Sequence, residues 1–127
     1  MRSIVTLIAL LVMALAVPST LANSNLDPIV ERGDSFRYRC EGGQIIRATY
    51  YSLNDHSLSF VRLKLPDGRR LTLPEVMSAS GARFSSDQDV IWWIKGNSGF
   101  VQQRDEKGKW TITLSSCVAE DEMDSAF

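Results

Sequence analysis

The chain of 127 residues has a single histidine and only two cysteines. A nucleophile–histidine–carboxylate triad requires histidine, and a zinc site needs three or four well-spaced ligands. His56 lies in the polar segment 54–57, which predicts a solvated turn. A phosphate-cradling Gly-x-Gly loop is also missing. We therefore expect no catalytic residue, no metal and no cofactor.

The chain also lacks a large excess of charge of either sign, because 14 Lys+Arg stand against 15 Asp+Glu, a net charge of −1. A protein that binds nucleic acid through its phosphates carries a basic excess, so we expect no nucleic-acid partner. Hydrophobic residues make up 44% of the chain, which predicts a packed domain rather than a disordered chain. A chain of this length builds one core.

No apolar run reaches the ~20 residues of a membrane span. The run Ile4–Val17 follows the positive Arg2 and precedes the small residues of Thr20-Leu21-Ala22. This pattern predicts a signal peptide at residues 1–22, cleaved after Ala22. The first cysteine is Cys40, so the acylated cysteine of a lipoprotein is not found behind the run. We expect an exported periplasmic protein with no stable membrane anchor after cleavage.

Cys40 and Cys117 form an even pair in a chain with export features. In an oxidising compartment such a pair is most simply a disulfide. It would join the first strand of the exported domain to its last. A catalytic or metal-binding thiol fits poorly, because the two cysteines lie far apart in sequence.

Turn signals recur about every ten residues between Gly33 and Cys117, which is typical of an all-β domain. Trp92 and its alternate neighbours share one strand face, whereas Trp93 and Lys95 share the other. A shift in the apolar phase after Phe60 predicts a β-bulge before Val61. The side chains expected to fill the interior include Phe36, Tyr38, Tyr50, Trp92 and Trp110.

Seven or eight short antiparallel strands leave exposed edges unless the sheet closes. A disulfide between the first and last strands favours closure into a small barrel. We divide the chain into a signal peptide (1–22), an N-terminal leader strand or coil (23–32), the barrel domain (33–117) and a loose acidic tail (118–127).

Two stretches are unusual. Small residues dominate Ser78–Phe84, which fits either a tightly inserting loop or a tight bend at a barrel corner. Lys95 ends a strand and enters the turn Gly96–Gly99, so it projects from the rim as a binding group or as a solvated lysine. Trp93 shares its face and is either an exposed anchor or a cover for the barrel end.

The sequence resembles the MliC/PliC family, the bacterial membrane-bound and periplasmic inhibitors of C-type lysozyme. The resemblance runs from about Phe36 to Cys117 and is specific through the order of its short pieces. Those pieces are Tyr38-x-Cys40, Ala48-x-Tyr50-Tyr51, Leu73-Pro74, Ser78-Ala79-Ser80-Gly81-Ala82-Arg83 and Trp93-x-Lys95-Gly96.

The resemblance implies an eight-stranded antiparallel barrel closed by a disulfide, with a loop that enters the lysozyme cleft. It matches Ser80 and Lys95 to the groups that engage the catalytic Glu and Asp of the enzyme. The other residues expected to bind lysozyme are Ala79, Gly81, Ala82, Arg83, Trp93 and Gly96. Arg83 would contact the cleft or hold the loop. Phe84 stands where the family has a tyrosine. If the tyrosine hydroxyl braces the loop in the family, a different group would have to brace it in this chain.

Three other functions remain open: a small-ligand carrier, an interaction module of the envelope, and a hydrolase. A carrier needs an interior cavity, and an interaction module needs an apolar patch on the outer wall. A hydrolase is the least favoured because it would depend on His56. The sequence leaves monomer and homodimer equally open.

Overall fold

A computed structural model describes residues 15–16, 27–86 and 89–120. The predicted signal peptide lies outside the described residues except for Leu15 and Ala16, and so does the predicted acidic tail from residue 121 onward. Within the described part, no helix is both long and apolar enough to cross a membrane.

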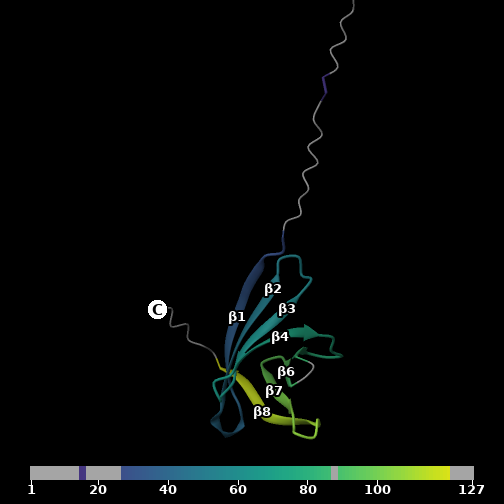
Figure 1. Ribbon diagram of the computed structural model, residues 1–127. Helices are drawn as coiled ribbons and strands as arrows, with labels where there is room; N and C mark the ends of the chain where they lie inside the picture. The colour runs from purple at the N-terminus through teal and green to yellow at the C-terminus, as the bar shows by residue number, and fades with distance from the viewer. Residues whose placement is uncertain (1–14, 17–26, 87–88, 121–127) are drawn as a thin grey trace, which may run out of the picture.

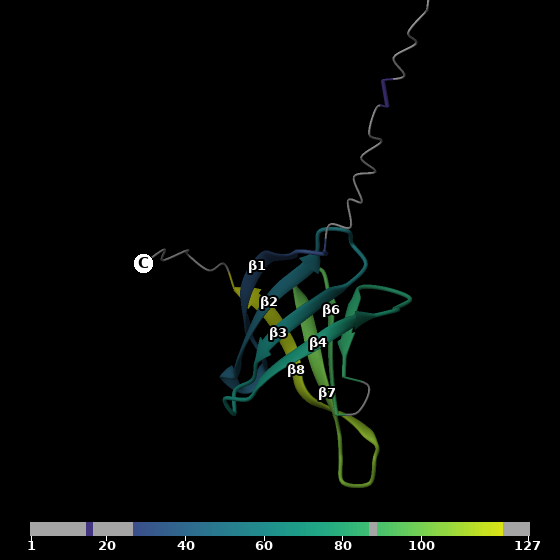
Figure 2. The same ribbon diagram turned by 45° about the horizontal axis from the view of Figure 1, so that its top comes forward.

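Eight antiparallel strands form a closed barrel in chain order (Figures 1 and 2). This confirms the predicted all-β, eight-stranded fold. The strands are β1 (Val30–Arg39), β2 (Ile45–Leu53), β3 (Ser59–Lys64), β4 (Arg70–Val76), β5 (Ala82–Ser85), β6 (Val90–Lys95), β7 (Ser98–Arg104) and β8 (Trp110–Glu120). A short 3₁₀ turn, η1 (Glu41–Gly43), connects β1 to β2.

The barrel closes between β1 and β8, where Tyr38 is paired with Ala119. The Cys40–Cys117 disulfide lies beside this seam and confirms the predicted bond. β8 runs three residues past the predicted domain end at residue 117, and β1 begins inside the segment assigned to the leader. Residues 30–32 are in strand conformation because they pair with β2, and residues 118–120 because they pair with β1 at the seam.

The core is built from inward-facing side chains around Trp92, which is fully buried. The Trp92 Nε1–H donates to the Tyr50 hydroxyl at 3.0 Å, and the Tyr50 and Tyr38 hydroxyls are 3.1 Å apart. Buried indole and phenol groups need such partners. Phe36 lies at the edge of this cluster and stays 37% exposed.

The bulge predicted between Phe60 and Val61 is wrong, because β3 pairs with β2 and β4 without a register shift. Val61 is fully buried, whereas Phe60 faces outward. Phe60 stacks on its cross-strand neighbour Tyr51, with ring centroids 5.0 Å apart. An outward aromatic pair produced the apparent change of phase.

The inward position predicted for Trp110 is also wrong. Irregular pairing between β7 and β8 sets Val101 opposite Leu114 but Gln102 opposite Ile112. Val101 faces the core, so Ile112 and Trp110 lie on the outer face. The Trp110 ring instead makes a cation–π contact with the Arg104 guanidinium, which lies 5.0 Å from the ring centroid.

Candidate functional site

The loop of residues 77–81 joins β4 to β5 at one end of the barrel. Met77, Ala79 and Ser80 are exposed, so the loop presents the Met77 side chain, a methyl group and a hydroxyl to solvent. Gly81 ends the loop with φ of +66°, a conformation that glycine adopts without strain.

Gly81 lies directly against the end of β6. A Cβ atom at this position would overlap the Ile94 carbonyl oxygen and lie 2.7 Å from Lys95 Cγ. The smallness of Gly81 therefore permits a close approach within the molecule, and it brings the loop beside Lys95.

Two hydrogen bonds hold the loop in place, and both end on the Ser80 carbonyl oxygen. The Trp93 Nε1–H donates to it at 3.0 Å, and the Ser78 hydroxyl donates at 2.6 Å. The Ser80 hydroxyl makes no hydrogen bond within the described residues. Trp93 thus connects the loop to β6 while the hydroxyl stays exposed.

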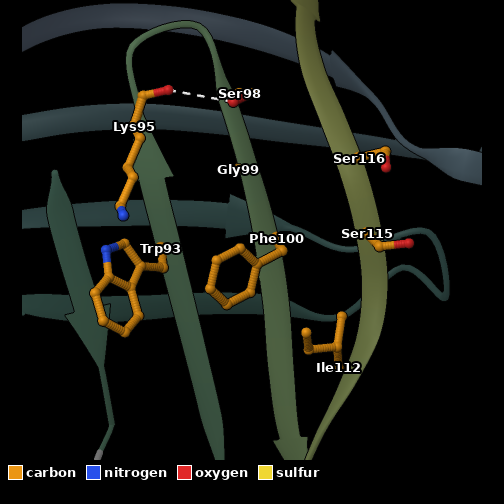
Figure 3. A pocket seen from close by; sticks show the side chains of 8 residues that line it. All are labelled: Trp93, Lys95, Ser98, Gly99, Phe100, Ile112, Ser115 and Ser116. Atoms are coloured by element: carbon orange, nitrogen blue, oxygen red, sulfur yellow. Dashed lines mark hydrogen bonds between the residues drawn. The ribbon is translucent and has the colours of Figure 1, made fainter.

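Lys95 is the last residue of β6 and is exposed. Its Nζ lies 6.0 Å from the centroid of the Trp93 ring, and the Arg83 guanidinium lies 5.7 Å from the same centroid. Figure 3 shows the Lys95 ammonium next to the Trp93 indole. The Arg83 Nε is buried without a hydrogen-bond partner in the described structure. The two cations therefore share one aromatic ring.

The structure brings the predicted site residues together at one barrel end. The pairing of β5 with β6 sets Ala82 opposite Ile94 and Arg83 opposite Trp93. The loop precedes Ala82, and Lys95 follows Ile94, so the two segments leave the sheet side by side. Gly96 begins the turn that follows Lys95 and has φ of +59°.

The sequence predictions missed a groove on the outer wall beside Lys95. It has a volume of about 260 Å³ and includes Trp93, Phe100 and the 57% exposed Ile112 (Figure 3). Phe100 was detectable, because a two-residue turn at positions 96–97 sets it opposite Trp93. Ile112 could not be predicted as part of the groove, since the irregular β7–β8 pairing cannot be recognised from the sequence pattern. Ser78 was part of a quoted motif, but its bond to the loop was not expected.

Phe84 occupies the position where the family resemblance placed a tyrosine. It is 4% exposed, and its ring centroid lies 5.5 Å from that of Tyr50. The side chain therefore belongs to the barrel interior, and the loop is held by Trp93 and Ser78 instead.

A second cavity, of about 350 Å³, lies at the same end of the barrel. Its walls include the rings of Phe36, Tyr50 and Phe84, together with Glu75 and Ala82. Burial raises the pKa of the Tyr50 phenol well above the ordinary tyrosine value, and burial also raises the pKa of Tyr38. Both phenols are therefore neutral at physiological pH.

The described part of the chain contains no cluster of three or more His, Cys, Asp or Glu side chains arranged to hold a metal ion. His56 is exposed in the turn after β2, where its backbone N–H donates to the Leu53 carbonyl.

A family model described as "Membrane-bound lysozyme-inhibitor of c-type lysozyme" (MliC) matches residues 38–110. Two similar curated proteins are each named "Membrane-bound lysozyme inhibitor of C-type lysozyme". The Yersinia enterocolitica protein is 36% identical over 86 residues, which are 68% of this chain and 63% of that protein. The Pseudomonas aeruginosa protein is 39% identical over 62 residues, which are 49% and 46% of the two chains.

The matches therefore span less than two thirds of the length of either curated relative. Among solved structures, Pseudomonas aeruginosa MliC in complex with hen egg white lysozyme aligns with a TM-score of 0.56 and 22% identity. The alignment covers 94% of this chain and all of the other. At this identity the likeness shows a common barrel fold.

Proposed function

We propose a function from one premise: the chain belongs to the MliC family of membrane-bound lysozyme inhibitors of C-type lysozyme. The family is one of inhibitors, not of enzymes. In our proposal this chain inhibits a C-type lysozyme by inserting the loop of residues 77–81 into the active-site cleft. One observation carries the proposal, namely that the exposed Ser80 hydroxyl and the Lys95 ammonium stand on adjoining segments at one barrel end.

These two groups match the chemistry of the cleft. A lysozyme holds one protonated carboxylic acid and one ionised carboxylate. Lys95 is a compact cation that pairs with the ionised group, and the Ser80 hydroxyl both donates and accepts hydrogen bonds. Such charge-assisted bonds are strong in a cleft closed to water. Occupying both carboxylates stops hydrolysis and requires no catalytic residue in the inhibitor.

The shape of the loop supports insertion. Ala79 and Gly81 keep it narrow, while Trp93 and Ser78 fix the Ser80 carbonyl before any partner arrives. A loop already held in its bound shape loses less conformational entropy on binding. The Arg83 guanidinium lies over the Trp93 ring, so in this proposal Arg83 helps to hold the loop.

The test measures how the purified protein slows cell-wall lysis by a C-type lysozyme. We expect inhibition by the natural chain and at least about tenfold weaker inhibition by Ser80→Ala and Lys95→Ala, since losing one partner of a buried charged pair costs about 2–5 kcal/mol. Ser52→Ala on β2 and Lys107→Ala in the β7–β8 turn are matched controls that should inhibit normally.

If the natural chain does not slow cell-wall lysis by the lysozyme, the proposed inhibitory function is rejected. Full inhibition by both Ser80→Ala and Lys95→Ala, with unchanged melting temperatures, would reject the mechanism alone. A native-gel or light-scattering measurement on the same samples separates monomer from homodimer.

The location of this activity is also proposed. The predicted signal peptide would deliver the chain to the periplasm, where an inhibitor protects peptidoglycan from a lysozyme that has crossed the outer membrane. Cell fractionation with intact-mass measurement tests this, and the expected product begins at Asn23. A product that retains residues 1–22 would contradict it.

The cavity at the barrel end favours a second candidate, a carrier of a small apolar ligand. Its volume of about 350 Å³ and its aromatic walls suit such a molecule. The test uses a fluorescent apolar probe. Binding of the probe to the natural chain, and loss of that binding in Ala82→Phe, which fills the cavity, would support the carrier function. Absence of probe binding would remove it.

A further inference from the structure

The outer wall of β1–β4 carries an unbroken row of cations. Arg37 is paired with Arg47, Arg47 with Lys64, and Lys64 with Arg70, so four positive side chains cross four neighbouring strands at one level. Figure 2 shows β2, β3 and β4 side by side on one wall of the barrel. We call this set the cationic row.

More cations flank the row, and in the described part of the chain Glu120 pairs with two cations of this wall. Arg47 also has an interaction partner. Arg39 and Arg62 lie on the same outer wall. Glu120 on β8 pairs with Arg37 at 3.0 Å and also with Arg39, which balances the β1 end. At the other end Lys64, Arg62 and Arg70 form no ion pair with described residues.

This arrangement works against folding, since like charges directly opposite each other in neighbouring strands are destabilising. Glu120 offsets Arg37, and Arg47 also has an interaction partner, so a negative partner on the wall lowers this cost for Lys64 and Arg70. A hollow of about 270 Å³ opens between Arg47 and Lys64, and Ile45, Leu65 and Pro66 complete its border. Cations around a shallow hollow suit an anionic headgroup.

The row is far from the proposed lysozyme site. Arg70 begins β4 and Val76 ends it, so the seven-residue strand separates the row from the 77–81 loop by about 20 Å. In Figure 2 the β3–β4 turn and the β4–β5 loop project at opposite ends of β4. A partner on the row therefore leaves Ser80 and Lys95 accessible.

We propose that the cationic row binds the surface of an anionic phospholipid membrane. A planar surface touches this wall alone. The whole chain has a net charge of −1, so the rest of the molecule is acidic and repels a polyanion that wraps around it, such as nucleic acid. Basic side chains near an anionic membrane each add about 1 kcal/mol of attraction. This inference does not depend on inhibition of lysozyme.

The experiment is co-sedimentation of the protein purified from an expressing bacterium with vesicles of pure phosphatidylglycerol or pure phosphatidylcholine. We expect binding to phosphatidylglycerol that weakens as salt is added. The variant Lys64→Glu/Arg70→Glu should lose at least about tenfold in affinity. The control Lys107→Glu/Lys109→Glu makes the same change of charge in the β7–β8 turn and should bind almost normally.

Equal losses in both double variants would show an effect of total charge and overturn the proposal. No binding of the natural chain to phosphatidylglycerol would also overturn it, as would full displacement by inorganic phosphate at equal ionic strength, which would indicate a site for free anions. Equal binding to phosphatidylglycerol and phosphatidylcholine would show that apolar contact and not the row drives binding, and it would overturn the proposal. Melting curves should show that Lys64→Glu/Arg70→Glu stays folded.

Discussion

At the scale of single residues, position 81 leaves no room for a methyl group. The backbone of Gly81 is left-handed, and a Cβ atom would overlap the Ile94 carbonyl oxygen. We expect Gly81→Ala to displace the loop, to weaken lysozyme inhibition at least about tenfold and to lower the free energy of unfolding by about 1–3 kcal/mol. Inhibition assays and denaturant titrations measure the two effects.

Gly68→Ala is the matched control. Gly68 also has a positive φ, of +90°, but nothing lies within 4 Å of a Cβ atom there. This variant should lose stability through its backbone alone and inhibit normally. If both variants inhibit equally well, contact between the loop and β6 does not matter for inhibition.

Tyr50 is the residue whose ionisation should limit stability in alkali. Burial raises its pKa above the ordinary value of 10.0, and the pKa of Tyr38 is also raised by burial. The fold holds both phenols neutral, so their contribution to the free energy of unfolding is complete below pH 10.0 and declines as the pH rises further.

Denaturant titrations at several alkaline pH values should show this decline, and Tyr50→Phe should make it shallower. Tyr51→Phe, on the outer wall, should leave the decline as it is in the natural chain. A pH dependence that Tyr50→Phe does not alter would assign the alkaline loss to other groups.

At the scale of strands, β6 shows what the sequence pattern determines. Strict alternation predicted that Trp92 would be inside, with Trp93 and Lys95 outside, and the structure confirms all three. Alternation works here because β6 pairs regularly with both neighbours over its described length.

The same rule fails on β8, whose pairing with β7 shifts register twice, because the shift between Val101 and Gln102 reverses the faces of the residues opposite and beyond it. Trp110 and Ile112 are apolar and alternate as core residues do, yet both lie outside. Composition cannot reveal this, since the bulge depends on the partner strand. The groove beside Lys95 was therefore beyond prediction, although Ser80 and Lys95 themselves were identified from the family resemblance.

Besides the close approach of Gly81, the indole N–H of Trp93 links the β4–β5 loop to β6. Trp93→Phe removes the hydrogen bond to the Ser80 carbonyl but keeps an aromatic ring under Lys95 and Arg83. We expect about 1 kcal/mol of lost stability and a several-fold weaker inhibition, with faster hydrogen exchange in residues 77–81.

Trp110→Phe provides the control, because Trp110 lies on the outer face and contacts Arg104. It should change neither inhibition nor exchange in the loop. Unchanged exchange in Trp93→Phe would mean that the Ser78 hydroxyl alone holds the loop.

At the scale of the whole molecule, barrel closure brings the lysozyme site together and separates it from the cationic row. Ser80 and Lys95 come from different hairpins, and only the pairing of β5 with β6 makes them neighbours. The row arises from the register of four other strands. The sequence pattern did not reveal this row, because the alignment of its cations is a property of the strand register.

The disulfide secures this closure. Cys40 and Cys117 are 77 residues apart, and on the chain-entropy model a closed loop of that length stabilises the fold by about 4–5 kcal/mol. Cys40→Ser/Cys117→Ser, or reduction of the natural chain, should therefore lower the melting temperature markedly. Inhibition measured well below the new melting temperature should persist, because both cysteines are buried at the β1–β8 seam and the loop lies between β4 and β5. Two reactive thiols in the native protein before reduction would contradict the bond, and loss of inhibition without unfolding would show that the seam also positions the loop.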